Sequence, residues 1–200
     1  MCIRDRKYPD VSVQLQVHST RRTGWSVANG QIDLAIIGGQ LSGDLENLLQ
    51  VIPYATDELA LVLPSKHQLS TKKELLKEDL YKLNFVTLDS QSTTRKVVDK
   101  LLQDSGLDIQ RLKIEMELNS LEAIKNAVQS GLGASFLPVV SIERELSAGT
   151  IHKAFVADLE VKRELKLITN PSRYTSRASQ VFKKNILPQF ASLESPLRNL

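Results

Sequence analysis

The sequence has almost none of the residues or runs that would build a metal centre, a disulfide bond or a membrane anchor. Its single cysteine, Cys2, excludes an internal disulfide and a zinc site made of thiolates. No apolar run approaches the roughly 20 residues of a membrane-spanning helix. Residues 1–10 carry charges without the apolar stretch of a secretory signal. We therefore expect a cytoplasmic protein that binds neither a metal ion nor a membrane.

Signatures of catalysis are missing as well. The histidines, His18, His67 and His152, lie far apart, and the chain contains no H-E-x-x-H, G-x-S-x-G or G-x-x-x-x-G-K-[ST] motif. Residues 131–133 read Gly-Leu-Gly, but they follow an expected helix instead of opening one, so they are not a dinucleotide fingerprint. We expect no cofactor and no enzyme activity, although a site assembled from distant residues around His18 and Ser19 stays an alternative.

The composition is that of an ordinary globular protein. Hydrophobic residues make up 42% and charged residues 24% of the 200 residues, which suits one large domain or two small ones. The net charge is only +3, and much of it lies in residues 4–7, so the chain does not have the charge of a nucleic-acid-coating protein. Residues 161–190 carry seven basic residues against one acidic residue, and we interpret that run as a solvated face.

Strand-like and helix-like segments alternate along the chain. Period-two alternation or short apolar runs predict strands, whereas apolar residues three and four apart predict helices, several of them followed by a glycine. The expected strands are 11–17, 34–37, 48–55, 58–63, 83–88, 113–118, 134–137, 151–156 and 164–169; the expected helices are 21–29, 92–105, 119–130, 138–148 and 176–190. Such alternation favours parallel βαβ units, and the break near Pro64 favours two α/β lobes.

Small polar residues gather where expected strands run into expected helices. In open α/β sheets, ligands bind beyond the carboxyl ends of the strands, where helix starts offer unpaired N–H groups. The candidate ligand contacts at these junctions are Ser19, Thr20, Ser90, Gln91, Ser92, Thr93, Asn119 and Ser120. Hydroxyl and N–H groups with arginine nearby suit a small carboxylate or phosphate. The alternative, that each of these residues only caps its helix, stays open.

Gly38 and Gly39 follow the expected buried strand at 34–37. They could let a ligand approach the backbone closely, or they could simply form a turn, and the sequence does not decide between the two.

The amino-acid sequences of four segments resemble those of a known family. They are VSVQLQVHSTRRTGWSVANGQIDLAIIGG (11–39), DELALVLPSKHQL (57–69), LDSQSTTRKVVDKLLQDSG (88–106) and MELNSLEAIKNAVQSGLGASFLP (116–138). Together they resemble the effector-binding domain of LysR-type transcriptional regulators, and within that family the regulators of RuBisCO operons in cyanobacteria and plastids. The resemblance extends from Tyr8 to about Phe190.

The resemblance implies an α/β fold of two Rossmann-like lobes, of the periplasmic-binding-protein type. Lobe I would comprise residues 8–63 and 168–193, and lobe II residues 64–167, with a tail at 194–200. It implies a small anionic metabolite bound between the lobes, which biases how a self-associated regulator holds promoter DNA. The family's effector contacts fall on loops that match Ser19, Thr20, Gly38, residues 90–93 and the neighbourhood of Thr169.

This sequence departs from the family at its beginning. Residues 1–7 match nothing in the family, and we interpret them as a spurious or unstructured leader. Lobe I would lack its opening strand and helix, so we expect the chain alone to be poorly stable. Promoter DNA would be bound only through a winged helix-turn-helix absent from this sequence, in the cytoplasm or the plastid stroma. The alternatives are a free solute-binding protein of a transporter and an α/β enzyme that uses the same cleft.

Overall fold

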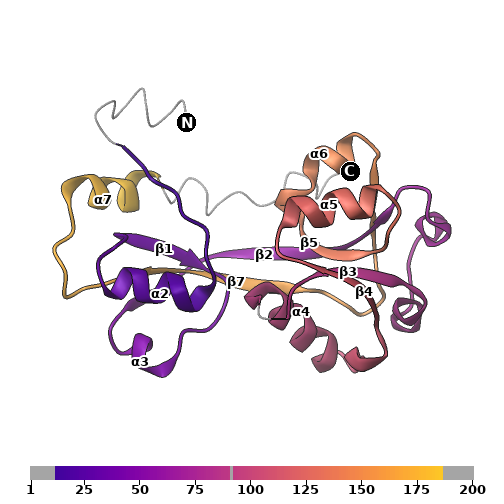
Figure 1. Ribbon diagram of the computed structural model, residues 1–200, viewed down its shortest axis with the longest axis horizontal. Helices are drawn as coiled ribbons and strands as arrows, with labels where there is room; N and C mark the ends of the chain where they lie inside the picture. Colours follow the sequence, from indigo (N-terminus) through magenta and orange to yellow (C-terminus); the bar gives the residue numbers. More distant parts are fainter. Residues whose placement is uncertain (1–11, 91, 187–200) are drawn as a thin grey trace. The chain divides into compact units, whose positions relative to one another are not determined.

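The computed structural model describes residues 12–90 and 92–186, which form two compact units (Figure 1). Unit 1 comprises the chain up to Ala55 and from Glu164 onward, and unit 2 comprises Thr56–Arg163. The chain passes between the units within two strands, β2 (Gln50–Pro64) and β7 (Lys162–Thr169), which are neighbours in the sheet. The expected lobe boundaries lie a few residues further along these strands, and the lobe assignment stays a prediction. The expected leader, the tail and Gln91 lie outside the described residues.

Unit 1 packs short helices around the antiparallel pair of strands β1 (Leu34–Ile37) and β7. Its helices are α2 (Thr20–Ala28), α3 (Gly43–Glu46), α7 (Arg177–Val181) and a π-helical turn at Phe182–Ile186. The buried core consists of Val27, Ile37, Leu45, Leu49 and Ile168. Four of these residues come from α2, β1, α3 and β7, and Leu49 immediately precedes β2, so the core joins segments from both ends of the chain.

The strand expected at residues 11–17 is wrong. Residues 12–19 form no regular structure, and the side chains meant for its dry face are exposed: Val13 by 43%, Leu15 by 88% and Val17 by 84%. An alternating pattern makes a strand only when a neighbouring strand satisfies its backbone N–H and C=O groups. Within the described part of the chain, β1 pairs with β7 alone, and no strand pairs with residues 12–19.

Unit 2 contains one antiparallel and one parallel set of paired strands. Its strands are the second half of β2, then β3 (Asn84–Leu88), β4 (Lys113–Leu118), β5 (Ser135–Pro138) and β6 (Ile151–Ala154). Its helices are α4 (Thr93–Asp104), α5 (Leu121–Gln129) and α6 (Glu143–Ser147). Short 3-10 turns lie at Gln68–Thr71, Lys77–Lys82, Ile109–Arg111 and Val139–Ser141. The strands β3 and β4 are parallel and α4 connects them, which is the expected βαβ unit. The helices α4 and α5 lie on opposite faces of these two strands (Figure 1).

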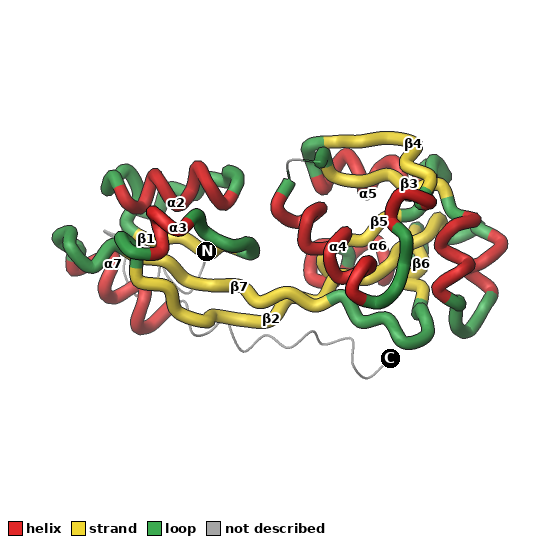
Figure 2. The backbone as a smooth tube through the Cα atoms, turned by 90° about the horizontal axis from the view of Figure 1, so that it is seen from below, coloured by secondary structure: helices red, strands yellow, loops and turns green. Residues whose placement is uncertain are grey.

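Parallel pairing is not general, however. The strands β5 and β6 both run antiparallel to β2, and β1 runs antiparallel to β7. The tube in Figure 2 shows β2 as one continuous strand where two runs, 48–55 and 58–63, were expected. The helix expected to begin at Pro138 is interrupted, as a 3-10 turn followed by α6.

The glycines expected to end helices do so. Gly30, Gly106 and Gly131 follow α2, α4 and α5 with φ values of +72°, +90° and +85°, a conformation in which a Cβ is strained.

Within the described residues, no helix combines the length and the hydrophobicity needed to span a membrane.

Candidate functional site

Two of the predicted junctions meet at one edge of the sheet in unit 2. In the parallel pair β3–β4, Leu88 lies opposite Leu118, and the N–H of Asp89 donates to the carbonyl of Leu118 at 3.1 Å. Both strands therefore end at the same edge. The segments that follow the two strands, which begin at Asp89 and at Asn119, therefore start close together. Ser90, Asn119 and Ser120 are exposed there, and Ser92 and Thr93 are half-buried. Their role as ligand contacts stays a prediction.

The serines at the two helix starts behave differently. Ser120 is the N-cap of α5, and its hydroxyl accepts a hydrogen bond from the N–H of Ala123 at 3.5 Å. Ser92 is the N-cap of α4, but its side chain makes no capping hydrogen bond. The first turn of a helix carries N–H groups without partners inside the helix. The hydroxyl of Ser120 is therefore used to cap α5, whereas that of Ser92 does not cap α4.

The spacing of Asn119 and Glu122 in the sequence is that of a capping pair at the start of α5, but the structure does not form it. The N-cap is Ser120, one residue later, and the carboxylate of Glu122 instead contacts the ammonium of Lys125 at 2.8 Å. A serine hydroxyl and an asparagine amide can both accept from the first turn, so local sequence alone does not choose between them.

The start of α4 is fastened to the end of β3 by Arg95. Its Nε donates to both carboxylate oxygens of Asp99 at 2.7 and 2.8 Å, and its Nη1 donates to the hydroxyl of Thr87 and, at 3.3 Å, to the carbonyl of Leu88. Glu117 adds a longer ion pair at 3.6 Å. The charge of this arginine is thus already balanced by carboxylates of the protein.

A pocket beside α4 is lined mainly by apolar side chains, among them Phe85, Val98, Leu102 and Ile114, and Arg95 is also in its lining. None of the predicted ligand contacts that the structure describes is among its lining residues.

A second arginine contacts the start of α4 from the other side. Arg163, on β7, donates to the carboxylate of Asp57 on β2, and its Nη1 donates to the hydroxyl of Thr94 at 2.6 Å. Neither Arg163 nor Asp57 nor Thr94 is among the predicted ligand contacts. Arg163 belongs to the basic run that we expected to be a solvated face, yet its side chain is only 14% exposed.

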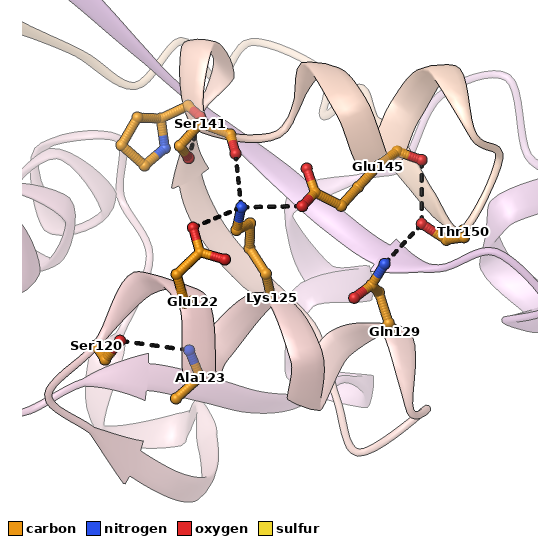
Figure 3. A network of polar contacts seen from close by, with 9 residues as sticks. Ser120, Glu122, Ala123, Lys125, Gln129, Ser141, Glu145 and Thr150 are labelled. Carbon is orange, nitrogen blue, oxygen red and sulfur yellow. Dashed lines mark hydrogen bonds and ion pairs between the residues drawn. The ribbon is translucent and has the colours of Figure 1, made fainter.

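The helix α5 is held to α6 by a buried lysine (Figure 3). The ammonium of Lys125, whose side chain is 8% exposed, contacts Glu122 at 2.8 Å, Glu145 at 2.9 Å and the carbonyl of Ser141 at 3.1 Å. The hydrogen bond that Lys125 donates to Glu122, more than the one it donates to Glu145, raises the pKa of Lys125 against the effect of burial. The hydrogen bond from Lys125 lowers the pKa of Glu145. This network fixes the helix that begins at Ser120.

The candidates in unit 1 lie at two ends of that unit. Ser19 caps α2 by accepting from the N–H of Arg22 at 3.5 Å, and Thr20 is buried. Gly38 follows the last residue of β1, whereas Thr169 lies opposite the first residue of β1 in the antiparallel pair.

The residue after Thr169 shows the same separation. The amide of Asn170 donates to the carbonyl of Ala28, the last residue of α2. The structure therefore places Thr169 at the end of α2 opposite to Ser19 and Thr20, and does not bring it together with them or with Gly38.

Comparison with known proteins identifies the family. The family model described as the LysR substrate binding domain matches residues 5–191. The chain belongs to this family. A protein named probable RuBisCO transcriptional regulator from Synechocystis sp. is 59% identical over 187 residues, which cover 94% of this chain and 54% of the relative. The protein of the same name from Porphyra purpurea is 56% identical, with coverage of 94% and 59%. The chain thus spans little more than half the length of these curated relatives.

Solved structures of LysR-family effector domains share the fold. The regulatory domain of Synechocystis CcmR, solved in complex with 2-PG, superposes with a TM-score of 0.80 at 23% identity, over 94% of this chain and 87% of that chain. The effector-binding domain of QuiR, in complex with shikimate, gives a TM-score of 0.76 at 20% identity, over 94% and 85%. The predicted family and the predicted two-lobed α/β fold class are thereby confirmed.

Proposed function

We propose that this chain is the effector-sensing part of a LysR-type transcriptional regulator of carbon-fixation genes, and that its effector is a small anionic metabolite. Membership of the family and the names of the relatives support the regulatory role. The whole protein would self-associate, contact promoter DNA through a winged helix-turn-helix outside these 200 residues, and act in the cytoplasm or the plastid stroma. Its effector would be bound without being transformed.

The observation that carries the proposal is the start of α4, where the side chain of Ser92 makes no capping hydrogen bond. Ser92 and Thr93 follow β3, Asn119 and Ser120 follow β4, and these two parallel strands end at the same edge. A helix start of this kind offers N–H donors, a partial positive charge and hydroxyl groups to an anion. Because Arg95 is balanced by Asp99 and Glu117, we assign the anion to the helix start and not to that guanidinium.

The proposal includes the remaining predicted ligand contacts. Ser90, Gln91 and Ser120 would add contacts in unit 2. Ser19, Thr20 and Gly38 would contribute from unit 1. The placement of Thr169 at the opposite end of unit 1 makes it the weakest member of the set.

The test is isothermal titration calorimetry of the 200-residue chain with 2-phosphoglycolate as the anionic probe and glycolamide as a neutral one. We expect binding of the first and none of the second. Ser92→Ala should weaken binding of 2-phosphoglycolate about tenfold, which is the usual contribution of a hydrogen bond to a charged group. Recovery of the ligand unchanged after incubation would separate a sensor from an enzyme.

Ser42→Ala is the matched control. Ser42 is also an N-cap serine without a capping hydrogen bond, but it precedes α3 in unit 1 and is not a candidate contact. The same substitution there should leave the affinity unchanged. The proposal fails if the wild-type chain binds neither probe, or if Ser92→Ala and Ser42→Ala bind 2-phosphoglycolate equally well.

A further inference from the structure

Two buried charges meet where the chain enters and leaves unit 2. Asp57, on β2, is the second residue of the unit, and Arg163, on β7, is its last. Their side chains are 8% and 14% exposed, and Nε and Nη2 of the arginine lie 2.8 and 2.6 Å from the same carboxylate oxygen. At such burial a charge that lost its partner would be costly to keep, so the pair holds β2 and β7 together at this point.

The same guanidinium reaches a third element. Its Nη1 donates to the hydroxyl of Thr94 at 2.6 Å. Thr94 is the second residue of α4, directly after Thr93 and two residues after Ser92. A guanidinium is planar and rigid, so the direction of the bond to Asp57 also fixes the direction of the bond to Thr94.

The bond from Arg163 to Thr94 complements the contacts that Arg95 makes at the start of α4. Arg95 ties the first turn of α4 to Thr87 and Leu88 at the end of β3, and Arg163 ties it to the two strands that connect the units. Together, the two arginines fix the position of the first turn of α4, and with it that of Ser92 and Thr93. Neither arginine needs to contact a ligand to do so.

We infer that Arg163 is a positioning residue for Ser92 and Thr93, the predicted ligand contacts at the start of α4, acting through Thr94 and held in place by Asp57. The inference rests on the proposed function, because it assigns a role toward the ligand of that site. Preorganised groups bind more tightly because less ordering is needed on binding. Both chain connections between the units run through β2 and β7. The bond from Arg163 to Thr94 therefore links the start of α4 to these two strands.

The experiment compares Thr94→Val, which keeps the shape but removes the acceptor, with Thr94→Ser, which restores it. Binding of 2-phosphoglycolate to the full 200-residue chain is measured by calorimetry, and the unfolding midpoint is measured alongside. Thr94→Val should weaken binding about tenfold, and Thr94→Ser should stay within about threefold of the wild type, because preorganisation depends on the hydrogen bond. Thr150→Val is the matched control. It removes a hydroxyl bonded to Gln129 in the same unit but remote from α4, and should bind normally.

A second variant tests the route of the effect. Arg163→Lys keeps the charge but cannot contact Asp57 and Thr94 with one planar group, so it should weaken binding as Thr94→Val does. The double variant should lose no more than either single one, because both remove the same contact. If the wild type does not bind, the proposed function is overturned and this inference falls with it. If the wild type binds and Thr94→Val binds equally well, or if Thr94→Ser fails to rescue, the inference alone is overturned.

Discussion

Replacing the buried lysine of α5 tests how the network in Figure 3 stabilises unit 2. In Lys125→Met the side chain keeps its length and apolar stem but loses the ammonium that contacts Glu122, Glu145 and the carbonyl of Ser141. Because the side chain is only 8% exposed, water cannot take over these contacts without local rearrangement.

The expected cost follows from the exposure of each partner. Glu122 is 76% exposed, so its pair with Lys125 contributes less than about 1 kcal/mol. Glu145 is 16% exposed, and its Oε2 is buried without a hydrogen-bond partner in the part of the chain that the structure describes. Breaking a buried pair costs about 3–5 kcal/mol. The helix α6 that carries Glu145 has five residues, and it can shift to hydrate the carboxylate. We therefore expect about 3 kcal/mol, the lower end of that range.

The assay is urea unfolding at pH 7, followed by circular dichroism, for the wild type, Lys125→Met, Glu145→Leu and the double variant. The double variant should recover much of the loss, because an apolar pair leaves no desolvated charge. Lys100→Met, on an exposed position of α4, is the control and should change stability by less than about 0.5 kcal/mol. A cost below about 0.5 kcal/mol for Lys125→Met, or a double variant as unstable as the single one, would refute the reasoning.

The pH dependence gives an independent check. The pKa of Glu145 is lowered in the folded chain by its bond to Lys125, so its contribution is complete above the ordinary carboxyl range and is lost as the pH falls through the lowered pKa. The pKa of Lys125 is raised, so its contribution is complete below the ordinary lysine range and is lost as the pH rises through the raised pKa. The deficit of Lys125→Met relative to the wild type should therefore be largest near neutral pH and shrink in acid.

Two further substitutions test local contacts. Hydrogen bonds from Lys82 and then Lys72 lower the pKa of Asp79 from 3.8 to about 2. Because both lysines are largely exposed, Asp79→Asn should cost about 1–2 kcal/mol in unfolding free energy at pH 7, and the difference should vanish as a titration falls from about pH 4 to below 2. Gly133→Ala would place a Cβ 2.6 Å from the carbonyl of Asn84, and calorimetric unfolding should show a loss of about 1–3 kcal/mol. An alanine at Gly43, which has nothing within 4 Å, should be neutral or stabilising by up to about 1 kcal/mol; equal effects at both positions would contradict this account.

Local patterns predicted the elements of this fold well where an element depends on its own residues. The strands at 34–37 and 113–118 have the expected bounds, and α2 and α4 are within a residue or so of theirs. Spacing of apolar residues and a glycine with positive φ act within one or two turns of chain, so they can be read from a window. The resemblance to the LysR family added the prediction of a two-lobed fold class.

It was also predictable that the segments following β3 and β4 begin at one edge of the sheet. The strands that precede them form one βαβ unit with α4 as the connection, and such units place both carboxyl ends at one edge of the sheet. Which serine at that edge caps its helix was not predictable, because Ser92 and Ser120 have the same local chemistry and differ only in how the chain around them is held.

The sequence by itself determined the elements, the family and the hydroxyl-rich helix starts, because these depend on residues close together in the chain. Tertiary structure decided the rest. Residues 12–19 have a strand pattern but no partner strand, and Thr169 is separated from Gly38 by the antiparallel register of β1 and β7. Arg163 meets Asp57 across 106 residues. Strand pairing and buried ion pairs join segments remote in sequence, and no local pattern specifies which partner a strand or a charge will find.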